Sequence, residues 1–158
     1  MRVALYQPEI AGNVGAVLRT AACLATPVDL IEPMGFQWDD RRVARAGMDY
    51  IEHVVVARHA EWDAFAAQVT GRLVLLTTRG ATPLHDFAFR ADDVLLFGQE
   101  GAGVPEAVHA RADARVVIPM APAVRSLNLG VSLAIVLGEA LRQTGGWPNS
   151  NTVRPSSR

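Results

Sequence analysis

Two uninterrupted apolar runs, RLVLLTT at 72–78 and DVLLFG at 93–98, constrain the fold of this sequence more than any other feature. A half-exposed strand alternates apolar and polar residues, whereas a strand covered on both faces has a continuous apolar run. Further short apolar stretches alternate with segments of helical spacing, which predicts an α/β fold with a mainly parallel sheet and helices on both faces. The expected strands are residues 2–6, 28–32, 53–57, 72–78, 93–98 and 115–120.

The segments between these strands have apolar residues at helical spacing. The first such helix begins at Asn13, which we expect to be its N-cap, and it carries Cys23 as a small buried apolar residue. His59 is expected at the edge of the helix at 60–69, just before inward-facing Trp62 and Phe65. The further expected helices are a short one within DDRRVARAG, then 60–69, 104–110 and a final one from Asn128 to Gln143 that stops at Gly145–Gly146.

The final helix differs from the others because it has almost no polar face. A helix that is apolar nearly all round has to be buried all round, and a terminal helix of a small domain rarely achieves this within one chain. We therefore expect a second copy of the chain to cover it. The sequence predicts one domain over 1–145, followed by a mobile polar tail over 146–158.

Composition excludes several classes of protein. The chain has 158 residues, and no apolar stretch has the roughly 20 residues that a membrane span requires. Cys23 is the single cysteine and the four histidines are scattered, so we expect a cytoplasmic protein with no disulfide framework and no metal site. The net charge is −1, which is not typical of a nucleic-acid-binding protein, although all fifteen basic residues are arginine.

Three loops that follow expected strands are polar or rich in glycine: QPEIAGNVGAVLR, FGQEGAGVP and IPMAPAVRSLN. Ligands of open α/β sheets bind beyond the carboxyl ends of the strands, where such loops meet. The usual nucleotide fingerprints are absent, since the first loop has only GNVG and the chain has no lysine for a phosphate loop. Glycine content alone leaves 98–103 open as either a ligand loop or a tight turn.

Arg125, Ser126 and Asn128 are polar residues between two strongly apolar segments. Ser126 and Asn128 can satisfy the unpaired N–H groups at the start of the final helix. A capping role explains Asn128 but leaves Arg125 unexplained. The residues alone therefore leave open whether this segment only caps the helix or also holds a ligand.

Taken together, PEIAGNVGAVLR, IEPMGFQWDDRRVARAGMDY, LLTTRG, FGQEGAGVP and IPMAPAVRSLNLG…LGEALRQ resemble the SPOUT methyltransferases. The similarity is strongest to the small enzymes that methylate the 2′-hydroxyl of the tRNA wobble ribose, and it covers 2–143 in order. It implies a C-terminal trefoil knot, a homodimer with active sites at the interface, and S-adenosylmethionine as methyl donor, with S-adenosylhomocysteine as product. The implied cofactor-binding residues are Leu76, Gly98, Ile118 and Ser126, and the implied catalytic residues are Arg19, Asn13, Glu100, Ser126 and Asn128.

The resemblance also implies the anticodon stem-loop of tRNA as the substrate. Arg41, Arg42 and Arg45 form the densest basic cluster and could contact its phosphates, although neighbouring aspartates leave internal ion pairs as an alternative. Trp38 and Tyr50 could stack on an unpaired base or pack within the protein. Two other functions remain open: methylation of another tRNA or rRNA position, and RNA binding by a catalytically inactive relative.

Overall fold

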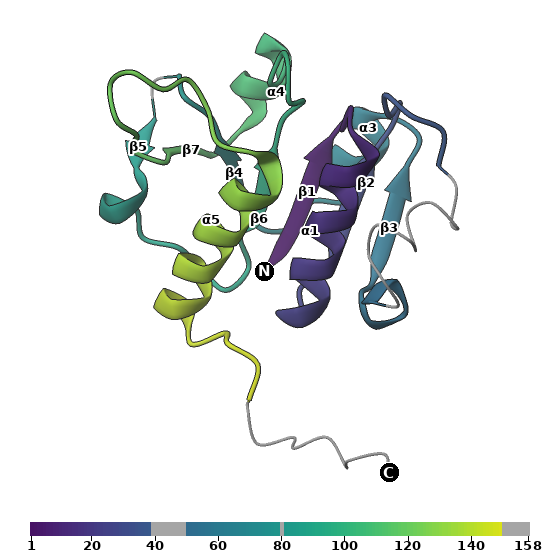
Figure 1. Cartoon of the computed structure of the whole chain (residues 1–158), viewed down its shortest axis with the longest axis horizontal. Coiled ribbons are helices and arrows are strands. Elements are labelled where there is room, and N and C mark those ends of the chain that lie inside the picture. Colours follow the sequence, from purple (N-terminus) through teal and green to yellow (C-terminus); the bar gives the residue numbers. More distant parts are fainter. Residues whose placement is uncertain (39–49, 80, 150–158) are drawn as a thin grey trace.

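The computed structural model describes residues 1–38, 50–79 and 81–149, which form an α/β fold around a seven-stranded sheet (Figure 1). All neighbouring strands run parallel, so connections between them cross over a face of the sheet. The predicted parallel α/β architecture is therefore observed. The strands are β1 (Arg2–Tyr6), β2 (Val28–Ile31), β3 (Val56–His59), β4 (Leu73–Leu76), β5 (Thr82–Pro83), β6 (Val94–Phe97) and β7 (Ala114–Val117).

Three strands differ clearly from the sequence prediction. Strand β7, expected at 115–120, ends at Val117. The strand expected at 53–57 begins at Val56, because Tyr50–His53 forms a 3-10 helix (η1) and Val56 is the residue that pairs with β2. Strand β5 was not predicted, since its two residues are too few to produce a recognisable pattern; Thr82 pairs with Val116 of β7. Periodicity therefore identifies the buried strands but not a short edge strand.

The strand order β3-β2-β1-β6-β4-β7-β5 reverses direction next to β1. From β1 the chain proceeds outward through β2 to β3, whereas the later strands are added on the other side. Val3 of β1 accordingly pairs with Val28 on one side and with Leu95 on the other. Parallel sheets bind ligands at such a reversal, beyond the carboxyl ends of the strands. The fold thus places the loops that follow β1 and β6 beside each other at this edge.

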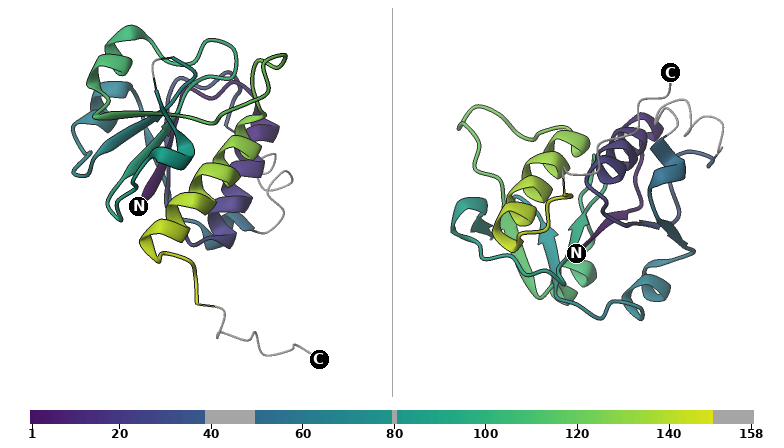
Figure 2. Two further views of the ribbon diagram at one scale, coloured as in Figure 1. Left: turned by 90° about the vertical axis from the view of Figure 1, so that its left-hand side faces the viewer. Right: turned by 90° about the horizontal axis from the view of Figure 1, so that it is seen from below.

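The helices in the described residues are α1 (Ala11–Cys23), α3 (Trp62–Ala66), α4 (Glu106–Arg111) and α5 (Leu129–Thr144), with 3-10 helices η1 (Tyr50–His53) and η2 (Leu84–Asp86). Helices α1 and α5 lie side by side on one face of the sheet, and α3 and α4 cover the other face (Figure 2). None of these helices is long and apolar enough to span a membrane.

Strand alternation divides the core into two layers. In β1, Val3 and Leu5 pack with α1 and α5, while Ala4 and Tyr6 pack with α3 and α4, and all four residues are buried. Full burial of a large aliphatic side chain stabilises a fold by about 1.5–3 kcal/mol. The continuous apolar runs of the sequence correspond to this burial on both faces.

The start of α1 and the environment of Cys23 differ from prediction. The helix begins at Ala11 with Ile10 as its N-cap, and no side chain caps it, so Asn13 lies within the first turn. Cys23 is exposed rather than buried. It lies two residues beyond Ala21 of the buried stripe, which at 100° per residue places it on the opposite side of the helix.

His59 is a buried residue of β3 and not a helix-edge residue. Its Nε2 lies 2.8 Å from Oδ1 of Asp29, and that carboxylate also accepts hydrogen bonds from Arg2 at 2.7 and 2.8 Å. The hydrogen bonds to Asp29 raise the pKa of the Arg2 guanidinium. A carboxylate that is 2 % exposed is tolerated because these partners replace its hydration. The prediction was wrong because β3 ends at His59, two residues beyond the end of the apolar run expected at 53–57.

Helix α5 is fixed at both ends. Its N-cap is Asn128, as predicted, whose Oδ1 accepts hydrogen bonds from Gly130 N at 2.8 Å and Val131 N at 3.3 Å. Its C-terminal side is followed by Gly145 in the left-handed region, at φ 66°. In the last turn, the Gln143 side-chain amide bonds to backbone groups of the segment that leads into β6. The final helix is therefore attached both to the loop before it and to a distant part of the chain.

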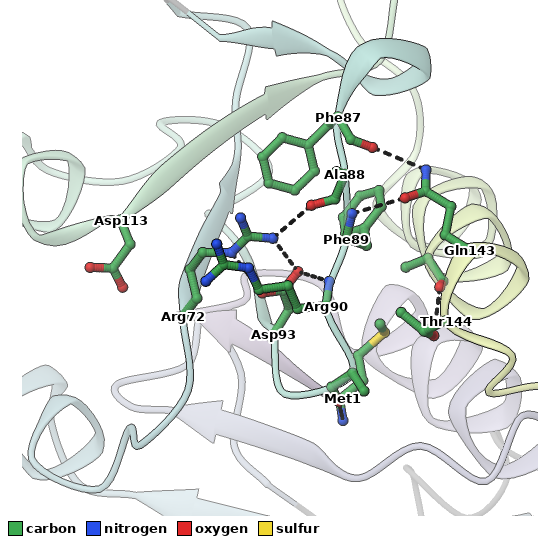
Figure 3. A network of polar contacts seen from close by, with 12 residues as sticks. Met1, Arg72, Phe87, Ala88, Phe89, Arg90, Asp93, Asp113, Gln143 and Thr144 are labelled. Atoms are coloured by element: carbon green, nitrogen blue, oxygen red, sulfur yellow. Dashed lines mark hydrogen bonds and ion pairs between the residues drawn. The ribbon is translucent and has the colours of Figure 1, made fainter.

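Figure 3 shows the contacts between the last turn of α5 and the segment that leads into β6. Gln143 Nε2 donates to Phe87 O at 3.0 Å, and Phe89 N donates to Gln143 Oε1 at 2.9 Å. Beside them, Arg72 makes two hydrogen bonds of 2.8 Å to the fully buried Asp93 carboxylate, which raise the pKa of Arg72. These contacts hold the starts of β4 and β6 and the end of α5 together.

Candidate active site

A cavity of ≈ 670 Å³ opens at the carboxyl ends of β4, β6 and β7, where the loops that follow these strands meet the start of α5. A cavity of this size can hold a small-molecule ligand. Residues far apart in the sequence meet in its wall, and they include every predicted cofactor-binding residue. The predicted site residues in the wall are Leu76, Gly98, Ile118, Ser126, Asn13, Glu100 and Asn128.

The segment 98–103 is a tight turn that also forms part of the cavity wall. Gln99 N donates to Gly103 O at 2.8 Å, and Gly103 N donates to Gln99 O at 3.0 Å. Gly103 has φ 70°, and a Cβ on Gly98 would lie 2.6 Å from the carbonyl carbon of Gly103. The two interpretations that glycine content left open therefore describe the same structure: the turn is tight, and its backbone lines the cavity.

Glu100 joins this turn to the loop that follows β1. Its carboxylate accepts hydrogen bonds from Glu9 N at 2.8 Å, Ile10 N at 3.3 Å and Asn13 Nδ2 at 3.0 Å. Asn13 Oδ1 in turn accepts a hydrogen bond of 3.0 Å from Asn128 Nδ2, the residue that caps α5. The side chains of Glu100, Asn13 and Asn128 thus form one hydrogen-bonded chain that positions three loops.

The loop that follows β7 contributes polar groups of a different kind. Arg125 and Ser126 are exposed residues in the cavity wall. Neither side chain makes a hydrogen bond to any residue in the described ranges. Their polar groups therefore remain available to a ligand, in contrast to those of Asn128 two residues later.

The charged residues in the cavity wall are Arg79, Arg125 and Glu100. The Glu100 carboxylate accepts hydrogen bonds from three N–H groups, so Arg125 is the charged side chain of the wall whose polar atoms have no partner in the described ranges. Arg79 Nη2 lies 3.2 Å from Glu106 Oε2 in an exposed ion pair. In the part of the chain that the structure describes, no group of His, Cys, Asp or Glu could hold a metal ion. Arg125 thus favours an anionic group at its place in the wall.

Residues 1–138 match the model of the SpoU rRNA Methylase family. The chain belongs to the SpoU methylase family. It is 56% identical over 146 residues, 90% of this chain and 91% of the relative, to a protein of Beijerinckia indica subsp. indica named tRNA (cytidine(34)-2'-O)-methyltransferase. A solved structure described as "Structural insights into the 2-OH methylation of C/U34 on tRNA" is 43% identical, with TM-score 0.85 and coverage of 90% of this chain and 94% of that chain. An AdoMet-bound rRNA methyltransferase from Sinorhizobium meliloti is 28% identical, with TM-score 0.81 and coverage of 89% and 55%.

Membership of the SpoU family confirms the resemblance to SPOUT methyltransferases. The SPOUT fold has a C-terminal trefoil knot, so the predicted fold class is confirmed together with its knot. The cavity lies among the late loops and the final helix of this SpoU chain. The family is one of methyltransferases, and its S. meliloti neighbour was crystallised with AdoMet.

Arg19 does not line the cavity of the SpoU chain. It is exposed on α1, and its guanidinium carbon lies 5.1 Å from the centroid of the Tyr50 ring. Along the helix it lies six residues beyond Asn13, a rise of about 9 Å. The structure therefore leaves Arg19 outside the cavity in which the other predicted site residues meet.

The predicted RNA-contacting residues are only partly within the structure. Trp38 and Tyr50 each have an arginine against the ring: the guanidinium carbon of Arg58 lies 5.3 Å from the Trp38 ring centroid, and Arg19 covers Tyr50. Each ring thus has an intramolecular contact, and stacking on a base stays a prediction. The short helix expected within DDRRVARAG lies outside the described residues. So do Arg41, Arg42 and Arg45.

Sequence reasoning missed three residues of the site. Glu9 accepts a hydrogen bond of 2.8 Å from Gly101 N through its side chain, and Arg79 and His109 line the cavity. Arg79 could have been found, since it follows an expected strand in the quoted LLTTRG segment. Neither Glu9 nor His109 has a comparable signal, because their positions depend on how distant loops fold together.

Proposed function

We propose that this chain transfers a methyl group from S-adenosylmethionine to the ribose 2′-hydroxyl of cytidine 34 in tRNA. The observation that carries the proposal is the cavity at the ends of β4, β6 and β7, found in a chain 56% identical to a protein named for this reaction. That identity covers 91% of the relative, so little of the relative lies outside the match. An action in the cytoplasm, where tRNA is available, belongs to the same proposal.

The cavity has the properties that S-adenosylmethionine requires. Its volume of ≈ 670 Å³ is in the usual range for a small-molecule site. Gly98 lets the backbone of Gly103 approach closely, which keeps the turn tight where its backbone lines the wall. We assign the cofactor to Leu76, Gly98 and Ile118 through their backbone groups, together with Ser126. When bound, it supplies a methyl group that is already activated on a sulfonium.

The polar residues of the site divide into two roles. Asn13, Glu100 and Asn128 satisfy one another and nearby N–H groups, so we assign them to positioning the loops rather than to the chemistry. Arg125 and Ser126 lack such partners in the described residues and are the groups that can contact the reacting ribose or its phosphate. Correct placement of the 2′-hydroxyl is the main contribution that they can make.

Arg19 is assigned to substrate electrostatics. A guanidinium stays protonated in proteins, so it is a poor general base. It is well suited to bind the phosphate next to the target ribose and to stabilise negative charge that develops on the 2′-oxygen. Because Arg19 lies outside the cavity of its own chain, this role requires a second subunit to bring it to the reacting nucleotide.

The surface of the chain supports such a homodimer. Val131 and Ile135 lie one turn apart on α5 and are 48% and 41% exposed, and Ile10 before α1 is 51% exposed. Large apolar side chains at this exposure, two on α5 and one directly before the neighbouring α1, favour an interface. The predicted contacts of Arg41, Arg42 and Arg45 with tRNA phosphates complete the proposal, as sequence-independent binding that weakens with salt.

Incubation of the protein with bulk tRNA and methyl-labelled S-adenosylmethionine tests the proposal. We expect mass spectrometry of nuclease digests to find 2′-O-methylcytidine at position 34. Label at another tRNA or rRNA nucleotide would favour the first alternative, methylation elsewhere. Binding of tRNA without label, and without heat of binding for S-adenosylhomocysteine in calorimetry, would favour an inactive relative. Either result contradicts the proposal.

A further inference from the structure

His109 lies in the cavity wall, although nothing in the assigned machinery uses it. It is a residue of α4 and is 6% exposed, yet it borders the cavity together with Leu75, Val104 and Val116. These three neighbours in the wall are at most 8% exposed and apolar. They form the inner part of the cavity, as distinct from its exposed entrance.

The imidazole of His109 has no polar partner within the described chain. Its backbone oxygen accepts a hydrogen bond of 2.8 Å from Arg115 Nη2, which holds the end of α4 in place, but its ring nitrogens bond to no described residue. Arg115 Nε is fully inaccessible to solvent and has no hydrogen-bond partner. The His109 ring nitrogens, by contrast, keep some accessible surface. Because His109 borders the cavity, a ligand in the cavity is the group that can supply the missing partner.

Polar side chains that are this deeply buried normally have a hydrogen-bond partner. Of the residues in the cavity wall that are less than 9% exposed, His109 is the one with a polar side chain; the others are Leu75, Phe97, Val104, Val116 and Leu129. A ligand that fills the inner cavity would therefore meet an apolar surface interrupted by one donor and one acceptor.

The two ends of the cavity suit different parts of S-adenosylmethionine. Arg79 and Arg125 are exposed in the wall and suit charged groups, such as the amino-acid carboxylate or an RNA phosphate. The buried apolar part suits a planar base, whose faces are apolar and whose edge carries hydrogen-bonding groups. A purine edge could satisfy an imidazole that the protein leaves unsatisfied.

We propose that His109 is a specificity-determining residue whose imidazole hydrogen-bonds to the edge of the cofactor's adenine. This inference rests on the proposed function, because it takes S-adenosylmethionine as the ligand. In this proposal α4 contributes to recognition of the base through a side chain. This contact is additional to the backbone contacts assigned to Leu76, Gly98 and Ile118. A site built in this way prefers adenine to a purine that carries a 6-oxo group, since the latter reverses the donor and acceptor pattern of the edge.

Calorimetric titration with two ligands tests this inference. S-adenosylhomocysteine and S-inosylhomocysteine differ in the 6-amino group of the base and are otherwise alike. We compare the wild type with His109→Phe, which keeps an aromatic ring but loses both polar atoms, and with His109→Gln, which keeps a donor and an acceptor. Val104→Ala is the matched control, since it changes the same wall without removing a polar group. Thermal unfolding without ligand identifies variants that do not fold.

We expect His109→Phe to bind S-adenosylhomocysteine roughly three- to tenfold more weakly, the loss of one neutral hydrogen bond. The preference for S-adenosylhomocysteine over S-inosylhomocysteine should fall with it, be partly kept in His109→Gln, and be unchanged in Val104→Ala. Unchanged affinity and preference in folded His109→Phe would overturn the inference. If His109→Phe does not fold, the other two variants decide. Loss of the preference for S-adenosylhomocysteine in both His109→Gln and Val104→Ala would then overturn the inference as well. Absence of binding to the wild type would instead contradict the proposed function.

Discussion

Glu100 has three N–H donors directed at its carboxylate and offers no donor in return. Glu100→Gln keeps the shape of the side chain but directs an NH₂ group at one of these donors. We expect a loss of about 1–3 kcal/mol in the free energy of unfolding, the cost of an unsatisfied hydrogen-bonding group. Urea unfolding measures it, with Glu106→Gln as control, because the Glu106 side chain is 77% exposed. Equal stabilities of the two variants would contradict the role of Glu100 in joining the loops.

Arg19 is predicted to act through its fixed positive charge. Arg19→Ala should lower kcat by about 10²–10³, as is usual when a group that stabilises developing charge is removed. Arg19→Lys should keep part of the activity, and its pH–rate profile should have the shape of the wild-type profile. Rates measured at several pH values distinguish the two roles. A lysine variant with near-full activity and a new basic limb would favour general-base catalysis instead.

Individual residues were predictable where their role is local. Asn128 caps α5 as expected, because an N-cap depends on the residues directly beside it in sequence. Asn13 has the same residue type but points to Glu100 and Asn128, which come from loops far along the chain. The burial of His59 and the exposure of Cys23 were misjudged, because element boundaries and helix phase decide them.

The turn between β6 and α4 depends on a close approach of two glycines. Gly98→Ala would place Cβ 2.6 Å from the backbone of Gly103, so the turn has to open. We expect binding of S-adenosylhomocysteine to be lost or to fall by at least tenfold in calorimetry. Gly12→Ala is the control, since Gly12 is exposed on α1 and its Cβ would meet nothing within 4 Å. It should leave binding unchanged and raise stability by up to about 1 kcal/mol. Normal binding by Gly98→Ala would contradict the assignment of this turn.

The ion pair between Arg72 and Asp93 holds the starts of β4 and β6. The hydrogen bond to Asp93 raises the pKa of the Arg72 guanidinium, and Asp93 is fully buried. Arg72→Met therefore leaves a buried carboxylate without its charged partner. We expect a destabilisation of about 3–5 kcal/mol in urea unfolding. Arg79→Met, which breaks an exposed pair, should cost less than about 1 kcal/mol. Similar losses in both variants would show that the buried pair has no special role.

At the level of elements, long apolar runs were the most reliable guide. The strands at β4 and β6 and the helix α5 lie within one to two residues of the predicted ranges, because burial on both faces leaves an unambiguous pattern. Strand β5 has two residues and could not be predicted by any periodicity. The predicted helix at 60–69 is shorter in the structure, Trp62–Ala66, although Phe65 is buried as expected.

For the whole molecule, we predict that α1 and α5 form the interface of a homodimer. Ile135→Glu places a charge among the exposed apolar side chains of α5 and should convert the dimer to a monomer, with loss of methyl transfer. Light scattering after size-exclusion chromatography measures the mass. Ala67→Glu, an exposed position after α3 on the other face, should leave the dimer intact. A wild-type protein that is a stable monomer would contradict this prediction.

The parallel sheet followed from the sequence pattern, but its strand order and knot did not. Strand order depends on which crossovers pack together, and knots are so rare that no physical reading of one sequence would suggest one. The resemblance supplied the knot, and membership of the SpoU family confirmed it. Locating the cavity needed both the sequence and the fold. The sequence predicted which loops carry polar residues, and the fold showed that these three loops meet.

Methyl transfer to matched tRNAs that differ in one oxygen atom tests the central claim most directly. One transcript carries cytidine at position 34, and the other carries 2′-deoxycytidine there. With labelled S-adenosylmethionine, we predict label in the first tRNA and none in the second, because the 2′-hydroxyl is the group that accepts the methyl group. Equal labelling of both tRNAs would place the methyl group elsewhere and contradict the proposed reaction.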